Sequence, residues 1–268
     1  MAEGHSHNPL DHVIDHNSIE LPFWDIQLPN VLGLQITRFM VMELLAAVLI
    51  ALIVIPLARH IARSPVTRGP IKNLFETLLL FVRDQVARPA IGGHDADKYV
   101  PYLWTLFFFV LTCNLLGMVP GGASATGNIN VTAVLAVMTL GTVILAGSRA
   151  MGPVGFWVGI VPHLDVPALL KPPLWGLMFL IEVAGLFIRH IVLAVRLFAN
   201  MMAGHIVLAV ILGFILVVEH SNLFAVVMPA SIVGSVALSL LELFVAFLQA
   251  YIFTFLSALF IGSAVHPH

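Results

Sequence analysis

The sequence has very little charge for its length. Only 10% of its 268 residues are Asp, Glu, Lys or Arg, whereas 60% are hydrophobic. A soluble domain carries about 25% charged residues, so the composition excludes an ordinary soluble protein and indicates residence in a lipid bilayer. The net charge of −2 includes no basic excess, which leaves a nucleic-acid partner without an electrostatic basis.

Other residue types and motifs are also scarce or missing. A single cysteine, Cys113, excludes an internal disulfide. The sequence has no glycine-rich phosphate loop and no His-Glu-x-x-His pair, so neither a nucleotide site nor an intramembrane metalloprotease is expected. We also expect no cleavable signal peptide, no metal and no other cofactor. The amino-terminal histidines show no recurrent ligand spacing; they are His5, His7, His12 and His16.

Five apolar runs dominate the chain, and about 20 apolar residues suffice for a helix to cross the hydrocarbon core. We therefore expect an all-α integral membrane protein with a single membrane domain. Its five transmembrane helices are expected at 36–58, 99–119, 129–146, 174–218 and 223–262, the first broken late by Pro56. The last two runs hold about 40 residues each, too long to stand upright, so a strongly tilted hairpin closed by a polar turn at 219–222 is predicted.

The basic residues between 59 and 72 set the orientation. By the positive-inside rule this loop is cytoplasmic, which places the amino terminus outside and, after five spans, the carboxyl terminus in the cytoplasm. Residues 1–34 are then a polar outer leader. Residues 71–89 show apolar and charged positions at helical spacing, which predicts an interfacial amphipathic helix. Residues 150–173, rich in proline, are expected to form an irregular cytoplasmic loop.

The run from 182 to 205 is apolar but contains several charged and polar residues. At about 100° per residue, Glu182, Arg189 and Arg196, spaced seven apart, share one stripe of a helix. Asn200 lies close to that stripe, and His205 lies on the opposite side. A charge in mid-bilayer costs roughly 2.5–3.5 kcal/mol on insertion scales, so such residues face protein or water and mark an ion path.

The last two helices supply a second constraint. If they form an antiparallel hairpin, His205 faces Glu242 and Arg196 faces Gln249, because both pairs are centred on about residue 223, beside the predicted turn. The His205–Glu242 pair is then either a proton relay or a buried structural pair. Arg196 has no acid on its stripe within two turns, so its counter-ion is expected on another polypeptide, unless it only packs between helices.

Two motifs resemble a known family, the membrane subunit a of F-type ATP synthases. One is Arg196-Leu-Phe-Ala-Asn200-Met-Met-Ala-Gly-His205, and the other runs from Glu242 through Gln249 to Tyr251. The Asn114-Leu-Leu-Gly-Met-Val-Pro120 segment and the loop from Asn128 to Thr132 also fit, and the resemblance covers nearly the whole chain. The chain departs from some relatives at Gly117, where an acid can stand, and at His190, where proline is common.

The resemblance implies a stator that presses two tilted helices against a rotating ring of c subunits, beside peripheral stalk b subunits, in a bacterial-type inner membrane. It implies that Arg196 attracts the ring carboxylate and separates two half-channels, and that Asn200 and Gln249 flank this arginine. Glu242 and His205 match the outer half-channel relay, and Glu182 matches the cytoplasmic one. Secondary candidates are Arg189, His190, Tyr251 and Asn114.

An alternative is an independent ion-coupled transporter. Transporters commonly show internal repeats and helices interrupted in mid-membrane. No period of 20–50 residues repeats in the sequence. The stator interpretation is therefore favoured, with ATP chemistry left to other subunits.

Overall fold

A computed structural model of the chain is predominantly helical in the part that it describes. The residues described are 18–21, 24–27, 30–31, 34–35, 37–63, 69–93, 95–119, 124–162, 167, 170–218, 221 and 223–266. The four amino-terminal histidines and most of the turn predicted at 219–222 lie outside these residues.

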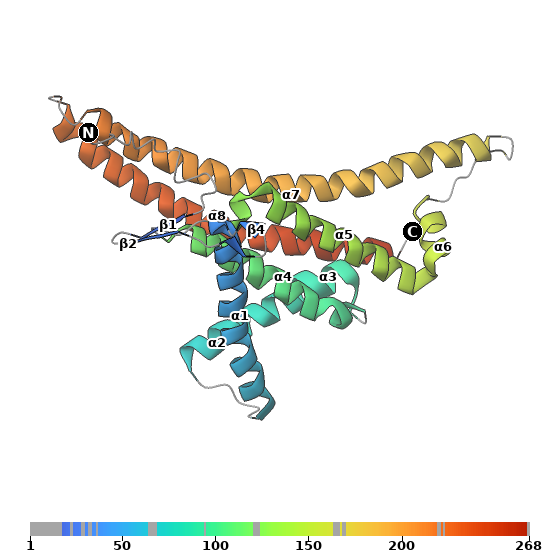
Figure 1. Cartoon of the computed structure of the whole chain (residues 1–268). Helices are drawn as coiled ribbons and strands as arrows, with labels where there is room; N and C mark the ends of the chain where they lie inside the picture. Colours follow the sequence, from blue (N-terminus) through green and yellow to red (C-terminus); the bar gives the residue numbers. More distant parts are fainter. Residues whose placement is uncertain are drawn as a thin grey trace. The chain divides into compact units, whose positions relative to one another are not determined.

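Within the described residues, five helices are long and apolar enough to cross a membrane, which confirms the prediction of an all-α integral membrane protein. They are α1 (Arg38–Arg63), α4 (Ala96–Gly117), α5 (Ile129–Met151), α7 (Lys171–Val217) and α8 (Phe224–Val265) (Figure 1). The two longest, α7 and α8, have 47 and 42 residues. At about 1.5 Å per residue they are roughly 60–70 Å long, twice the hydrocarbon thickness, and their tilt in a bilayer stays a prediction.

Two helices differ from the sequence expectation. The first does not break at Pro56 but continues to Arg63. A helix keeps its backbone groups paired in lipid, where an early end would leave them unsatisfied, so one proline is tolerated inside it. The segment expected to be an irregular loop contains a short helix, α6 (Pro153–Gly159). Pro153 occupies its first turn, where a missing N–H costs nothing.

The predicted interfacial helix is divided into three parts. They are α2 (Pro70–Phe81), a π-helical segment η1 (Val82–Ala87) and α3 (Arg88–Ile91). Pro89 lies two residues after the end of the π segment, and in a regular α-helix its ring would clash with the Gln85 carbonyl. The wider π turn accommodates this proline without ending the helical path.

The described part of the amino-terminal leader forms two short antiparallel pairs. Strand β1 (Ser18–Leu21) pairs with β2 (Trp24–Gln27), and β3 (Asn30–Val31) pairs with β4 (Leu34–Gln35). In each pair two residues separate the strands, the commonest length of a hairpin connection. These strands were not anticipated, because the leader's polar composition suggested no regular structure.

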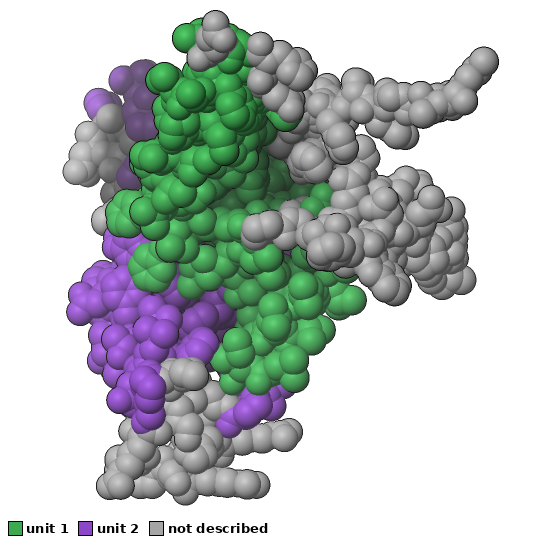
Figure 2. Space-filling view, turned by 90° about the vertical axis from the view of Figure 1, so that its left-hand side faces the viewer, with its two compact units in different colours: residues 1–53, 109–128, 197–249 green, residues 54–108, 129–196, 250–268 purple. Residues whose placement is uncertain are grey.

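The chain divides into two compact units (Figure 2). Unit 1 comprises residues 1–53, 109–128 and 197–249, and unit 2 comprises residues 54–108, 129–196 and 250–268. Each unit therefore contains part of α7 and part of α8, and each holds its own group of the predicted site residues.

Unit 2 is held together by close backbone approaches and a few polar links. The indole of Trp104 on α4 donates a 2.9 Å hydrogen bond to the Leu79 carbonyl at the end of α2. Arg83 of η1 forms two hydrogen bonds, of 3.0 and 3.2 Å, with the Asp97 carboxylate at the start of α4. Gly262 of α8 lies against the Ala90 carbonyl of α3, so closely that a β-carbon would overlap that oxygen.

Candidate functional site

In unit 1 the structure brings His205 of α7 and Glu242 of α8 together, as the hairpin register predicted. His205 Nδ1 lies 3.8 Å from Glu242 Oε1. This separation is longer than a hydrogen bond, which spans about 2.7–3.2 Å between heavy atoms. Glu242 is only 9% exposed, and among the described residues neither its Oε1 nor His205 Nε2 has a hydrogen-bond partner. Buried polar atoms of this kind are normally bonded, to water where not to protein.

A glycine makes room for the Glu242 carboxylate. A β-carbon on Gly204, the residue before His205, would overlap Glu242 Oε1 and stand 3.1 Å from its Cδ. The carboxyl group therefore packs against the backbone of α7 rather than against a side chain. This role of Gly204 was missed in the sequence, since a glycine in an apolar helix carries no signal of what approaches it.

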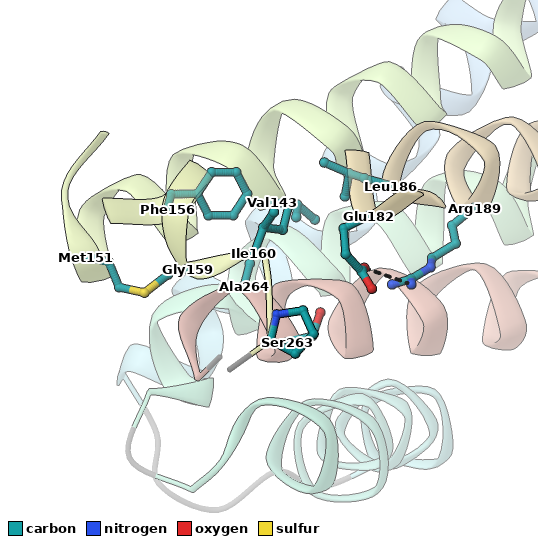
Figure 3. A pocket seen from close by; sticks show the side chains of 11 residues that line it. Val143, Met151, Phe156, Gly159, Ile160, Glu182, Leu186, Arg189, Ser263 and Ala264 are labelled. Atoms are coloured by element: carbon teal, nitrogen blue, oxygen red, sulfur yellow. Dashed lines mark ion pairs between the residues drawn. The ribbon is translucent and has the colours of Figure 1, made fainter. Parts of the chain in front are cut away.

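In unit 2, Glu182 and Arg189 form an ion pair along α7, with Arg189 Nη2 3.7 Å from Glu182 Oε2. They share the helix stripe predicted from their seven-residue spacing, although their pairing was not foreseen. Their charged ends face each other at the edge of a cavity of about 270 Å³ (Figure 3). The other lining residues include Leu186 of α7, Val143 of α5, Phe156 of α6 and Ser263 near the carboxyl end of α8. The cavity is large enough to hold several water molecules, each of which occupies about 30 Å³ in the liquid.

Arg196 lies seven residues after Arg189, on the exposed side of α7. Its neighbours on that side are apolar: Val192 and Val195 are each 46% exposed. Within the described ranges no acidic group forms an ion pair with Arg196. Asn200, one turn later, is half-buried. Arg196 belongs to unit 2 and Gln249 to unit 1, so their expected pairing stays a prediction.

Two secondary candidates pack in unit 2. His190 is 3% exposed and its Nδ1 lies 2.8 Å from the Leu186 carbonyl, so Nδ1 carries the proton and Nε2 is a buried acceptor. Its ring stands 5.1 Å from that of Phe260 on α8. Tyr251 packs against Phe81 of α2, with ring centroids 5.7 Å apart.

Asn114, the last secondary candidate, is completely buried in unit 1. Its Nδ2 donates a 3.2 Å hydrogen bond to the Ala246 carbonyl of α8, and its Oδ1 accepts a 2.6 Å hydrogen bond from Thr126. Thr126 belongs to η2 (Ala125–Gly127), a single 3₁₀ turn before α5. Sequence analysis missed Thr126 and its neighbour Ser124, whose only signal was two hydroxyl residues within a glycine-rich loop.

Comparison with known proteins adds to this geometry. The model of a family described as ATP synthase A chain matches residues 40–262. ATP synthase subunit a 2 of Chlorobaculum tepidum is 42% identical over 262 residues, which cover 95% of this chain and 72% of that protein. ATP synthase subunit a of Myxococcus xanthus is 45% identical over 240 residues, or 88% of this chain and 76% of the relative. The chain belongs to the ATP synthase subunit a family.

A third relative, ATP synthase subunit a of Chloroherpeton thalassium, is 41% identical over 96% of this chain and 76% of its own length. The resemblance drawn from the motifs is thus confirmed. Every candidate residue lies inside the segment that matches the subunit a family: Asn114, Glu182, Arg189, His190, Arg196, Asn200, His205, Glu242, Gln249 and Tyr251.

The structure shows what a side chain at position 117 would meet. A β-carbon on Gly117 would overlap the Ser124 Cβ and stand 2.8 Å from the Ser124 Cα, within the same unit. An acidic side chain at 117 is therefore incompatible with this loop conformation. The loop that carries Ser124 and Thr126 occupies the space that a carboxylate would need.

Proposed function

We propose that the chain is the proton-conducting stator of a rotary F-type ATP synthase. In this role it offers two offset half-channels to a ring of c subunits and contributes the arginine that couples proton flow to ring rotation. The chain carries out no ATP chemistry itself. The observation that supports this most strongly is Arg196, a cation on an exposed apolar helix face with no ion-pair partner among the described residues.

A guanidinium is always charged in a protein. In lipid an uncompensated charge is costly, so Arg196 needs an anion from outside its own chain. A carboxylate on each passing ring subunit meets that need for a moment and is then released. Because the guanidinium cannot give up its proton, it also prevents protons from passing directly between the two half-channels. Asn200 and Gln249 serve as uncharged polar neighbours of this encounter.

The His205–Glu242 pair serves the outer half-channel. Glu242 is buried, His205 is half-buried, and the two side chains lie close to each other. Glu242 Oε1 and His205 Nε2 are both buried atoms without a hydrogen-bond partner within the part of the chain described. A water molecule bonded to both Glu242 Oε1 and His205 Nδ1 would give the carboxylate a partner and connect the two groups for proton transfer. The wet relay is thus favoured over a purely structural pair, which would be expected to close to hydrogen-bonding distance.

The Glu182–Arg189 pair serves the cytoplasmic half-channel. Its cavity in unit 2 combines apolar walls with one carboxylate and one guanidinium at the rim. The Glu182 carboxylate, 3.7 Å from the Arg189 guanidinium, accepts a proton that leaves the ring and releases it to the cytoplasm. The energy available is about 2.3 kcal/mol for each charge moved through 100 mV.

The remaining features of the proposal concern partners and orientation. The c ring and peripheral stalk b subunits are the protein partners, and the membrane is a bacterial-type inner membrane. The basic stretch from 59 to 72, which covers the end of α1 and the start of α2, faces the cytoplasm by the positive-inside rule, so the amino terminus is outside and the carboxyl terminus inside.

Arg196→Ala in the complete reconstituted ATP synthase tests the proposal. We expect ATP-driven acidification of vesicles to be lost, because the ring carboxylate no longer meets a counter-ion. Arg149→Ala is the matched control, since Arg149 is an exposed arginine at the end of α5 and is not among the residues that line the cavity in unit 2. This variant should pump within twofold of the parent. Copurification with the ring establishes assembly. Normal pumping by an assembled Arg196→Ala complex would refute the stator mechanism.

A further inference from the structure

A chain of hydrogen bonds connects a loop, the end of α4 and the middle of α8 within unit 1. The hydroxyls of Ser124 and Thr126 lie 2.7 Å apart, and Thr126 Oγ1 lies 2.6 Å from Asn114 Oδ1. Asn114 Nδ2 then reaches the Ala246 carbonyl at 3.2 Å. Asn114, Thr126 and Ala246 are fully inaccessible to solvent, and Ser124 is 3% exposed. We call Ser124, Thr126 and Asn114 the polar clamp.

Chemistry fixes the direction of every bond in the polar clamp. Asn114 Oδ1 can only accept, so the single hydroxyl proton of Thr126 is committed to it. The Ser124 hydroxyl therefore donates to Thr126 at 2.7 Å, and its approach to the Cys113 carbonyl is longer, at 3.5 Å. With its oxygen held by Thr126, the Asn114 amide can turn only its NH₂ toward the Ala246 carbonyl. The chain ends in an amide, which does not exchange protons as carboxylates and imidazoles do, so it fixes positions rather than carrying protons.

The far end of the polar clamp lies beside the proposed outer half-channel. Ala246 is one helical turn after Glu242 and three residues before Gln249, on the same stripe of α8. The hydrogen bond from Asn114 to the Ala246 carbonyl fixes this stretch of α8 both in rotation about the helix axis and in position along it. The small side chain of Ala246 lets the Asn114 amide reach the backbone, which a larger residue would cover.

The position of α8 matters because Glu242 has little freedom. Its carboxylate packs against the backbone of Gly204 and stays 3.8 Å from His205 Nδ1. A slide or rotation of α8 by less than 1 Å would either press the carboxylate into α7 or open its gap to the imidazole. The loop end of the clamp is equally confined, since Ser124 lies against Gly117 with no space for a β-carbon.

We propose that Ser124, Thr126 and Asn114 are positioning residues that set the Glu242–His205 separation through the Ala246 carbonyl. The inference rests on the proposed function of that pair in proton transfer. It assigns to a hydroxyl-bearing loop, which touches neither group, control over the rate of the outer half-channel.

Thr126→Val tests the inference, because valine keeps the shape of threonine and removes only the hydroxyl. In vesicles holding the complete ATP synthase, we expect passive proton conduction per assembled complex to fall by roughly tenfold, within the range of about 10² that a 1 Å misplacement can cost. Thr126→Ser restores the hydroxyl and should return the rate to within twofold of the parent. Equal rates for the valine and parent complexes would overturn the inference, as would failure of the serine variant to recover.

A double-mutant cycle with Glu242→Gln separates positioning from general loosening of the fold. If the polar clamp acts through Glu242, Thr126→Val should reduce proton conduction by a much smaller factor when Glu242→Gln is already present. An equal reduction in both backgrounds would overturn the inference. A Glu242→Gln complex that conducts normally would instead remove the proposed role of the pair. If the valine complex does not assemble, Ser124→Ala is tested in its place. We expect this variant to conduct protons two- to threefold more slowly than the parent, and an unchanged rate would overturn the inference.

Discussion

The Glu242 carboxylate lies directly over the α-carbon of Gly204. If residue 204 had a β-carbon, Glu242 Cγ would lie 3.5 Å from it and Glu242 Oε1 would overlap it. An ionisable group is thus seated against the backbone of the neighbouring helix, one residue before the histidine that it faces. The space between α7 and α8 at this point is set by the absence of a single methyl group.

Gly204→Ala should therefore displace the Glu242 carboxylate. We expect proton conduction through the assembled complex to fall at least tenfold, because either the carboxylate rotates away from His205 or the two helices separate. Passive proton uptake by vesicles measures the effect. Gly234→Ala is the control on α8: a β-carbon there meets only Ile211 Cγ2, at 3.9 Å, and alanine favours a helix by about 1 kcal/mol. A Gly204→Ala complex that conducts protons as fast as the Gly234→Ala complex would argue against close packing of the Glu242 carboxylate on Gly204.

Glu242→Gln should slow proton entry on the outer side without preventing assembly. Glutamine has nearly the same shape but cannot take up and release a proton, so we expect ATP-driven pumping to fall by about 10²-fold, as is usual when a proton-transfer group is lost. Ser239→Ala, on the same stripe of α8, removes a hydroxyl that bonds only the Ser235 carbonyl of its own helix and should change little. If the Glu242→Gln complex pumps at the parental rate, the His205–Glu242 pair has a structural role and does not transfer protons.

Glu182→Gln should impair the cytoplasmic side. The substitution leaves Arg189 without its 3.7 Å partner and removes the one carboxylate that the described residues contribute to the lining of the cavity in unit 2. We expect ATP synthesis driven by an imposed proton gradient to fall by roughly tenfold, since proton release to the cytoplasm loses its acceptor. The same exchange at Glu76, on α2 and outside the cavity, serves as the control and should stay within twofold. Equal losses at the two positions would contradict a local role for Glu182.

Gly262→Ala should destabilise unit 2 rather than alter proton transfer. Its β-carbon would overlap the Ala90 carbonyl and stand 3.1 Å from the Ile91 α-carbon, both of which belong to the backbone of α3 and cannot rotate away. Overpacking of this kind costs about 1–3 kcal/mol. Thermal unfolding of the purified complex should show a lower midpoint than Gly141→Ala, where a new β-carbon meets nothing within 4 Å. An unchanged midpoint would mean that α8 and α3 are less tightly packed than the structure indicates.

The membrane-spanning helices could be predicted because their signal is local. A run of about 20 apolar residues must be helical in lipid whatever its neighbours are. The His205–Glu242 contact was predictable for a related reason: once two long helices form a hairpin, one register brings together residues far apart in sequence. The spacing of Glu182 and Arg189 predicted a shared stripe but not the ion pair between them.

Features that depend on close three-dimensional approach could not be read from the sequence. The π turn before Pro89 and the helix α6 depend on local backbone geometry that apolar periodicity does not report. The polar clamp depends on a hydroxyl of η2 meeting an amide of α4, and nothing in the composition of the loop distinguishes Ser124 or Thr126 from its other small residues. Gly204 and Gly262 look alike in sequence, yet one makes room for a carboxylate and the other for a carbonyl.

The hydrogen bond from Asn114 to Ala246 joins residues separated by 132 positions. During synthesis α4 therefore enters the membrane with an amide that has no carbonyl to receive it until the final helix has left the ribosome. A polypeptide halted before α8 would hold an unsatisfied polar group in lipid, a feature that quality-control proteases can recognise. The last helix thus supplies the acceptor for an amide that lies 132 positions earlier in the chain.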